Sequence, residues 1–248
     1  MNESKLSPEE LERYDRQLRI TGWGVESQLK VKGSHVMVVG AGGLGCPTAL
    51  YLAAVGVGHI AVVDRERVEL SNLNRQVLHW SGDLDKPKVE SVAEKLRKLN
   101  PNVRVEPLQL ELNEENIEDL IRKFDVVVDC LDNWRTRFIL NEACVKSRKP
   151  LVHAGVHSWY GQITTVLPGR GPCLRCIWPE NPPETGRFPI LGATAGTLGL
   201  LEALEVVKLI TGLGQPLVGR LLYLDLEIAS IEELKVERVE NCPVCGSI

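Results

Sequence analysis

The chain has 248 residues, of which 44% are hydrophobic and 25% are charged. At about 150 residues per domain this length predicts one or two domains, long enough to bury a substantial apolar core. The composition is that of an ordinary globular protein and excludes a disordered or fibrous one. With 29 basic against 33 acidic residues, the net charge of -4 argues against direct nucleic-acid binding through a basic face.

No stretch of the sequence is long and apolar enough to span a membrane, because the best candidate, residues 193–213, carries Glu202, Glu205 and Lys208. The first 13 residues are polar and acidic, which is not the pattern of a signal peptide. We therefore expect a cytoplasmic protein without membrane contact. In that compartment cysteines are more often metal ligands or core residues than disulfides.

Helical and strand patterns alternate along the first 160 residues. Ser7 and Pro8, followed by acidic residues, predict a helix start, and short apolar runs such as HVMVV (35–39) predict buried strands. The predicted helices cover residues 8–19, 44–55, 88–99, 114–123, 134–146 and 195–211. The predicted strands cover residues 35–39, 60–63, 103–110, 126–128, 151–154, 162–167, 217–228 and 231–239.

This alternation predicts an α/β fold with a Rossmann-like, doubly wound and mostly parallel sheet that carries helices on both faces. The rhythm changes after residue 160, where an antiparallel C-terminal extension is expected, and residues 168–192 are predicted to form a loop. We expect one domain over residues 1–248. It would consist of an N-terminal helical arm (1–30), a nucleotide-binding core (31–160) and a C-terminal part (161–248).

A glycine-rich turn lies between the first predicted core strand and the helix after it. The sequence GAGGLG (40–45) has the spacing G-x-G-x-x-G, and Asp64 ends the next predicted strand. Gly40, Gly42 and Gly43 permit a tight turn and bring backbone N–H groups close to phosphate, while Asp64 can hydrogen-bond ribose hydroxyls. The pattern predicts nucleotide binding without naming the nucleotide. The chain has no P-loop sequence G-x-x-x-x-G-K-[ST].

Basic and amide residues follow at or near later strand ends, in SNLNRQ (71–76), KPK (86–88) and DCLDNWRTR (129–137). Such positions converge on the ligand crevice of a doubly wound sheet, so Arg75 and Lys88 could neutralise a triphosphate and Asp132 could hold Mg²⁺. Phosphoryl or nucleotidyl transfer needs this positive charge, whereas hydride transfer does not. The alternative is that Lys88 and Arg137 are solvated side chains on helix faces, which is the better interpretation of an isolated lysine, whereas Arg75 in its Asn-rich loop favours a functional role.

Four of the seven cysteines form two C-x-x-C pairs: Cys173 with Cys176, and Cys242 with Cys245. Two such pairs predict a tetrahedral site of four sulfurs, the usual arrangement of structural zinc, which would clamp the C-terminal tail to a mid-chain loop. A redox-active C-x-x-C is the alternative, but it would need only one pair near a thioredoxin-like motif. The remaining cysteines are expected in the core: Cys46, Cys130 and Cys144.

The chain resembles the adenylyltransferases that activate ubiquitin-like sulfur carriers, namely the molybdopterin-synthase and thiamine-biosynthesis activating enzymes, which are related to ubiquitin-activating enzymes. The resemblance covers nearly the whole chain and rests on RYDRQ (13–17), GAGGLG, Asp64, SNLNRQ, PKVE (87–90), DCLDN (129–133) and the C-x-x-C pairs. It implies an enzyme that binds ATP and Mg²⁺, adenylates the C-terminal glycine carboxylate of a carrier ending in Gly-Gly, and releases pyrophosphate.

The resemblance also implies roles for individual residues. Arg16 would reach the active site of a second subunit, so a homodimer is expected, and Arg75, Lys88 and Asp132 would complete the catalytic set. The carrier tail would pass under the loop of residues 177–192, which makes residues 161–248 the zinc-clamped, carrier-binding part. The implied nucleotide-binding residues are Gly40, Gly42, Gly43, Asp64, Ser71, Asn72, Arg75, Lys88, Asp132 and Asn133.

The chemistry of this reaction agrees with the residue types present. A carboxylate is already ionised at neutral pH, so the enzyme needs alignment and positive charge but no general base. The histidines are accordingly interpreted as structural: His79, His153 and His157. Many relatives carry a cysteine in the loop before the long helix that forms a covalent carrier intermediate, but residues 177–195 contain none. We therefore expect adenylation without a covalent intermediate, with sulfur delivered by another protein.

Three other functions are alternatives to the adenylation of a carrier protein. G-x-G-x-x-G is also the fingerprint of an NAD-dependent oxidoreductase. A branch of the same family dehydrates modified tRNA after adenylation, although paired C-x-x-C motifs fit the carrier-activating enzymes better. A non-enzymatic, zinc-stabilised scaffold is disfavoured because Arg16, Arg75, Lys88 and Asp132 are all present. The sequence leaves open whether the carrier serves molybdenum cofactor or thiamine synthesis, tRNA thiolation or protein modification.

Overall fold

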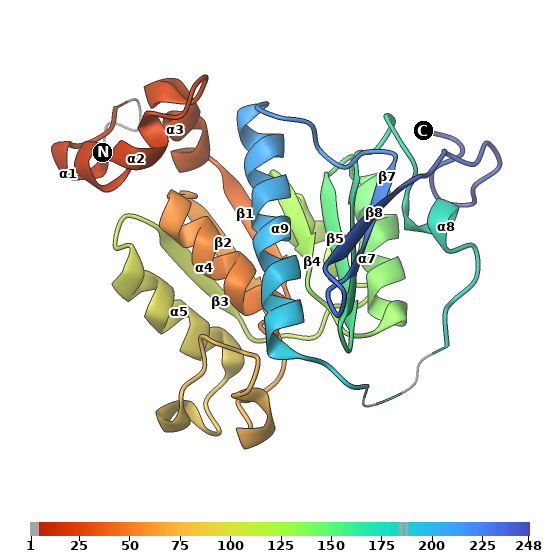
Figure 1. Cartoon of the computed structure of the whole chain (residues 1–248), viewed down its shortest axis with the longest axis horizontal. Coiled ribbons are helices and arrows are strands. Elements are labelled where there is room, and N and C mark those ends of the chain that lie inside the picture. The colour runs from red at the N-terminus through yellow and green to blue at the C-terminus, as the bar shows by residue number, and fades with distance from the viewer. Residues whose placement is uncertain (1–4, 184–185, 187) are drawn as a thin grey trace.

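Valine-rich, buried strands form the centre of the fold. Figure 1 shows these strands with helices packed around them. The computed structural model describes residues 5–183, 186 and 188–248. Its described strands form one eight-stranded sheet in the order β3-β2-β1-β4-β5-β6-β7-β8. Their bounds are β1 His35–Val39, β2 His59–Val63, β3 Arg104–Leu108, β4 Val126–Asp129, β5 Leu151–His157, β6 Tyr160–Val166, β7 Arg220–Asp225 and β8 Ser230–Lys235.

Strands β1 to β5 run parallel, whereas β6, β7 and β8 each pair antiparallel with the preceding strand. This arrangement confirms the predicted mostly parallel sheet with an antiparallel C-terminal extension. Successive side chains of β1 point to opposite faces: Val36 and Val38 belong to one apolar core, and Met37 and Val39 to the other. A strand covered on both faces must be apolar along its buried part, which explains the unbroken run VMVV (36–39) after the exposed His35.

Helices cover both faces of the sheet, and α4, α5 and α9 lie together on one of them (Figure 1). The helices are α1 Pro8–Arg13, α2 Asp15–Leu18, α3 Gly24–Lys32, α4 Gly45–Val55, α5 Lys88–Leu99, α6 Ile117–Ile121, α7 Trp134–Lys146, α8 Leu174–Ile177 and α9 Gly192–Thr211, with 3-10 turns η1 Leu70–Asn72 and η2 Ser81–Asp83. Helices α5 and α7 begin and end at the predicted residues. The division of the chain into arm, core and C-terminal part stays a prediction, and residues 1–4 of the arm lie outside the described residues.

The predicted helix over residues 8–19 is wrong at its middle, because the chain turns at Tyr14 between α1 and α2. The Tyr14 ring is buried, its hydroxyl accepts a hydrogen bond from Asn100 Nδ2 (2.9 Å), and it lies where a side chain at Gly56 would stand. Tertiary contact therefore overrides the local helical pattern. Helix α3 was not predicted, because it buries Ser27 and Gln28 together with Val31 and so shows no clean apolar stripe.

The carboxyl ends of the parallel strands meet at one edge of the sheet. Gly40 follows β1, Asp64 follows β2 and Asp129 ends β4, so these positions are neighbours although they are far apart in sequence. The strand order reverses direction between β1 and β4, which is where doubly wound sheets bind ligands. No helix in the described part of the chain is long and apolar enough to cross a membrane.

Candidate functional site

The glycine loop at the end of β1 is shaped by two glycines that no other residue could replace. Gly40 has φ +106°, and a Cβ there would lie 2.5 Å from the Cys130 carbonyl oxygen. A Cβ on Gly45 would lie 1.8 Å from the Gly40 carbonyl oxygen, which is a severe clash. By contrast, a Cβ on Gly42 would meet only Gln76 Nε2, at 3.7 Å. Gly40 and Gly45 close the turn, and Gly42 leaves open space beside the start of α4.

Asp64 holds the loop in place from the neighbouring strand. Its Oδ2 accepts a hydrogen bond from the Ala41 backbone N–H (2.8 Å), and its Oδ1 accepts one from the Glu66 backbone N–H (2.8 Å). Each carboxylate oxygen has a second lone-pair direction, so further donors can still bind. The predicted pairing of a glycine loop with an acidic strand end is therefore formed.

The segment SNLNRQ lies over this loop. Asn72 is buried in η1 and accepts a hydrogen bond from the Glu69 backbone N–H (3.0 Å), which fixes the turn that carries Ser71 and Arg75. The Arg75 side chain lies beside Gly43, where an added Cβ would be 3.5 Å from its Cγ. Its Nη1 donates to the Ser71 carbonyl (2.8 Å). The structure thus brings Arg75 to the glycine loop, and Ser71 and Asn72 belong to the turn just before Arg75.

Lys88 and Arg137 are both buried, with exposed fractions of 3% and 6%, so their interpretation as solvated helix side chains is wrong. Lys88 Nζ forms an ion pair with Glu66 Oε2 at 2.6 Å, and its hydrogen bond lowers the pKa of the Glu66 carboxyl. Lys88 is the first residue of α5, and its backbone N–H donates to the carbonyl of Glu66 (3.0 Å), which lies in the chain just after Asp64. A burial of this kind depends on a segment distant in sequence, which helical periodicity does not report.

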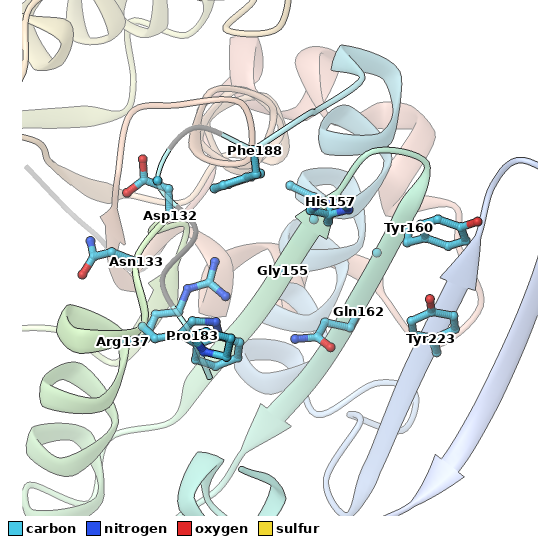
Figure 2. A pocket seen from close by; sticks show the side chains of 14 residues that line it. Asp132, Asn133, Arg137, Gly155, His157, Tyr160, Gln162, Pro183, Phe188 and Tyr223 are labelled. Atoms are coloured by element: carbon cyan, nitrogen blue, oxygen red, sulfur yellow. The ribbon is translucent and has the colours of Figure 1, made fainter. Parts of the chain in front are cut away.

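A cavity of about 520 Å³ opens on the other side of β4 (Figure 2). Asp132 and Asn133 from the start of α7 form one wall, and Asn133 also caps that helix by accepting from the Thr136 backbone N–H (2.9 Å). Asp132 is exposed, and its carboxylate accepts no hydrogen bond within the described chain. The glycine loop, Asp64, Arg75 and Lys88 are not among the described residues that line this cavity.

The floor of the cavity is formed by β5, β6 and β7, and sequence reasoning missed it. Register places Gly155 beside Gln162 and Gln162 beside Tyr223, so residues from three strands form one row. The other lining residues include His157, Tyr160, Pro183 and Phe188, and the His157 and Phe188 rings stack with centroids 6.1 Å apart. The alternation in YGQITTV (160–166) was the available signal, but it cannot reveal strand neighbours.

The histidines differ in their environments. His79 and His153 are buried and hydrogen-bonded: His79 to Ser91 Oγ and the Ala41 carbonyl (both 2.9 Å), and His153 to Asp129 (2.7 Å). Their structural interpretation agrees with these contacts. His157 is exposed and lines the cavity, so the purely structural interpretation of this residue does not hold.

Arg16 is exposed and lies far from the other predicted residues. It sits on α2, and the adjacent Gln17 donates to the carbonyl of Val55, the last residue of α4 (3.0 Å). Helix α4 starts at the glycine loop, and its 11 residues span about 16 Å to the opposite edge of the sheet. The structure therefore separates Arg16 from the glycine loop of its own chain.

The four cysteines of the C-x-x-C pairs converge on one point. Their sulfurs lie within 4.8 Å of one another, with Cys173 and Cys242 at 3.7 Å and Cys176 and Cys245 at 3.4 Å. A tetrahedral metal with bonds of about 2.3 Å to sulfur separates its ligands by about 3.8 Å, so the arrangement can hold such an ion. The other three cysteines are buried as expected: Cys46, Cys130 and Cys144.

The backbone around Cys242 favours its thiolate, whereas burial and the neighbouring sulfurs raise the pKa of Cys173 and of Cys245. Burial raises the pKa of the Cys242 thiol, but the backbone N–H groups of Cys245 and Val244 outweigh it and lower that pKa to about 7. The Val239 N–H donates to Cys176 Sγ at 3.4 Å. All four sulfurs are buried, so the cluster offers no open face for a substrate.

The family model described as "ThiF family" matches residues 14–244. The chain belongs to the ThiF family. It is 42% identical to the heterocyst protein HesA of Trichormus variabilis and 44% identical to the SAMP-activating enzyme E1 of Haloferax volcanii, covering 98% and 97% of this chain and 91% of each relative. It is also 42% identical over 98% of its length to the adenylyltransferase and sulfurtransferase MOCS3 of Drosophila ananassae, but spans only 55% of that protein.

Solved structures place this ThiF-family chain beside E. coli MccB. The crystal structure of MccB with ATP superposes with a TM-score of 0.86 at 25% identity, covering 94% of this chain and 74% of MccB. MccB with MccA-N7isoASN superposes with a TM-score of 0.87 at 24% identity, covering 99% and 76%. The resemblance stated from the sequence is confirmed, and the oxidoreductase and tRNA dehydratase alternatives are not favoured.

Proposed function

We propose that this chain uses ATP to adenylate the C-terminal carboxylate of a small ubiquitin-like protein, with release of pyrophosphate. The observation that carries the proposal is the order of strands across the sheet. Asp64 and the glycine loop follow β2 and β1, Asp132 follows β4, and the cavity floor begins at β5. A nucleotide bound over β1 and β2 would reach the end of β4 from one side. The C-terminus of the carrier, bound over β5 and β6, would reach it from the other. Relatives named as adenylyltransferases and activating enzymes support this assignment.

In the reaction, a carboxylate oxygen of the carrier attacks the α-phosphorus of ATP, the new O–P bond forms, and the bond to pyrophosphate breaks. The attacking group is an anion, so this chain must bring two anions together and stabilise the charge on the phosphoryl oxygens. Arg75 and Lys88 would supply positive charge at the triphosphate. Lys88 would exchange its Glu66 partner for phosphate, and Gly42 leaves the backbone open to close approach.

Among the described residues that line the cavity, Asp132 is the carboxylate suited to Mg²⁺. Asp132 presents a solvent-exposed carboxylate without a hydrogen-bond partner among the described residues, and hard oxygen ligands are what Mg²⁺ takes. The ion would neutralise triphosphate charge. Asn133 would fix the position of Asp132 through its cap on α7.

We also propose that the active protein is a homodimer completed by Arg16. The arginine lies at the opposite edge of the sheet from its own glycine loop, so only a second copy could bring it to that site. The predicted passage of the tail under residues 177–192 includes 184, 185 and 187, which lie outside the described residues. The described members of this segment, Pro183 and Phe188, line the cavity.

The four-cysteine cluster would hold structural Zn²⁺, because it supplies four sulfurs at tetrahedral spacing and no open position. Residues 177–195 lack a cysteine that could attack the acyl-adenylate, so we propose that a separate sulfur donor acts on it. A thiol-sensitive covalent adduct between enzyme and carrier would contradict this part. Seven reduced thiols fit a cytoplasmic location.

The test is pyrophosphate–ATP exchange with purified protein and ubiquitin-like proteins from the same organism. We expect incorporation of labelled pyrophosphate into ATP that depends on a carrier ending in Gly-Gly, and none with the same carrier lacking its last two residues. Failure of every such carrier to support exchange would reject the proposal. If the oxidoreductase alternative were correct, NAD would raise Tm and ATP would not.

A further inference from the structure

His79 lies against the glycine loop but has no part in the proposed chemistry. It belongs to the connection between β2 and α5, which folds below α4 and α5 in the view of Figure 1. Its side chain is buried, and Nε2 lies 2.9 Å from the Ala41 carbonyl oxygen in the glycine loop. A buried polar ring in this position can set the orientation of the loop backbone.

The hydrogen bonds around the His79 ring run in one direction. A carbonyl oxygen only accepts, so Nε2 must carry the proton that points to Ala41. Burial lowers the pKa of His79, so the ring is neutral at pH 7 and Nδ1 is an acceptor. The Ser91 hydroxyl donates to Nδ1 (2.9 Å) rather than to the more distant Leu78 carbonyl (3.3 Å), and Lys95 Nζ donates to Ser91 Oγ (3.1 Å). The ring is thereby held in the tautomer that donates to the loop.

The Ala41 carbonyl decides where the next backbone N–H points. It belongs to the same peptide group as the Gly42 N–H, and this bond is trans, so the two groups point in opposite directions. With the carbonyl turned inward to His79, the Gly42 N–H points outward, and it has no acceptor among the described residues. A Cβ on Gly42 would meet only Gln76 Nε2, at 3.7 Å, so a ligand can approach this N–H.

Ala41 is held on both sides, by different groups. Its own N–H donates to Asp64 Oδ2 (2.8 Å), and its carbonyl accepts from Cys46 Sγ (3.3 Å) as well as from His79. A thiol is a weak donor, so His79 supplies the stronger of the two hydrogen bonds to the carbonyl. Asp64 thus fixes the peptide group before Ala41, and His79 fixes the one after it. Loss of His79 would release the Gly42 N–H while Asp64 stays in place.

We propose that His79 is a positioning residue for ATP, which turns the Gly42 N–H toward a phosphate oxygen without touching the nucleotide itself. This assignment rests on the proposed use of ATP. A backbone N–H without an acceptor in the protein, just before the start of a helix, suits an anionic oxygen. A donor that is already oriented needs no reorganisation when the phosphate binds. His79 therefore acts on the phosphates of ATP through one peptide group, and binding of the adenosine part does not depend on it.

The experiment replaces His79 with two amides that differ by one methylene. The amide of His79→Gln reaches the position of Nε2 and can donate to the Ala41 carbonyl, whereas the shorter side chain of His79→Asn reaches only the position of Nδ1. In calorimetry, His79→Gln should bind ATP within about threefold of wild type. His79→Asn should bind ATP at least about 10-fold more weakly, the loss expected for one hydrogen bond to a charged group. Adenosine affinity, measured by ligand-observed NMR, should change less than about twofold in both variants.

The amide signal of Gly42 gives a readout that reduced stability alone would not move. Labelling alanine with ¹³C at the carbonyl and glycine with ¹⁵N selects the three Ala-Gly bonds of the chain, which precede Gly42, Gly155 and Gly196. In wild type and in His79→Gln, ATP should move the Gly42 N–H signal downfield, and adenosine should not. In His79→Asn, the downfield shift caused by ATP should be lost.

His59→Leu is the control for loss of a histidine, because His59 starts β2 at the opposite end from Asp64 and contacts Glu106 Oε2 (2.9 Å). It should change none of these values. Wild-type ATP affinity in His79→Asn, or equal losses of ATP and adenosine affinity, would overturn the assignment. If His79→Asn does not fold, the wild-type spectrum still decides, since a Gly42 signal that ATP leaves unmoved would also overturn it.

The outcome for His79 is separable from that of the adenylation proposal. If wild type binds ATP but no carrier supports pyrophosphate exchange, the proposed function fails, and the ATP and adenosine affinities still decide the role of His79. If wild type does not bind ATP, both proposals fail.

Discussion

The glycine-loop edge and the cysteine cluster both gather residues from distant parts of the chain, but they hold them differently. At the loop edge, Lys88 is paired with a half-exposed glutamate and Asp132 is exposed without a hydrogen bond among the described residues. In the cluster, Cys173 and the other three sulfurs are buried and turned toward one centre. The first arrangement leaves groups that can change partners, and the second leaves none.

This difference indicates which residues meet a substrate and which maintain the fold. A side chain that must bind a ligand has to keep free donors or acceptors, or hold a partner that it can exchange. A side chain that only stabilises the fold is best fully satisfied inside the protein. Substitutions at the loop edge should therefore lower activity without loss of stability, and substitutions in the cysteine cluster should lower stability.

The largest effect is expected at the loop edge. Asp132→Ala removes an exposed carboxylate that stabilises nothing within the described chain, so the protein should stay folded and keep its metal at the cysteines. Removing one group that stabilises developing charge commonly costs about 10²- to 10³-fold in rate. Pyrophosphate exchange should fall by at least that factor, with Tm within about 2 °C of wild type. Near-normal exchange would remove Asp132 from the mechanism.

A smaller effect, on stability, is expected at the cluster. Cys173→Ala leaves three sulfurs, and because metal binding is coupled to folding, the free energy of unfolding should drop by about 2 kcal/mol or more, which lowers Tm by about 4–8 °C. Bound zinc per chain, measured by mass spectrometry, should fall with it. Cys144→Ala is the matched control, a buried cysteine outside the cluster, and should keep its zinc. Equal stability of Cys173→Ala and wild type would contradict a structural metal.

The smallest effect concerns Glu202, which lies behind the glycine loop. Its Oε2 accepts from Thr48 Oγ1 (2.8 Å) and Cys130 Sγ (3.2 Å), and burial raises its pKa to about 8. The folded protein keeps this proton where the unfolded chain loses it above about pH 4.5, so stability should fall as the pH rises from about 4.5 to 8. Glu202→Gln should be near wild type at pH 5 and more stable at pH 8, by an amount on the order of 1 kcal/mol or more.

Urea unfolding at the two pH values measures this difference. Glu205→Gln is the control, because Glu205 on the same helix forms an ion pair with Lys208 and accepts from the Leu217 backbone N–H (2.7 Å). Its loss should destabilise the protein at both pH values. If the free energy of unfolding of Glu202→Gln changed with pH as it does in wild type, a neutral, buried Glu202 would not be the cause of the pH dependence.

The features of the candidate site that the sequence could predict are those whose geometry is local. Gly40 and Gly45 lie at the two ends of a six-residue turn directly after β1, and a Cβ is sterically excluded at both. Each C-x-x-C pair is local in the same sense. That the two pairs come together could be predicted because a structural zinc site needs four ligands and each pair supplies two. The fold class was predictable because buried parallel strands must be apolar throughout.

The rest depends on contacts between distant segments. The cavity floor exists because Gly155, Gln162 and Tyr223 fall in register on three strands, and a shift of one residue would turn each side chain to the other face. The burial of Lys88 and Arg137 depends on chain segments that cover them. The break at Tyr14 depends on Asn100, 86 residues away. The periodicity of apolar residues within one helix or strand does not predict such contacts.

The cysteine cluster also has a consequence for chain entropy. Cys173 and Cys242 are 69 residues apart, so a metal held there closes a loop that contains α9, β7 and β8. The entropy of closing a loop grows only with the logarithm of its length, and doubling the loop costs about 0.6 kcal/mol. Insertions in the surface turns of this loop are therefore cheap in closure entropy, whereas Gly45 tolerates not even a methyl group.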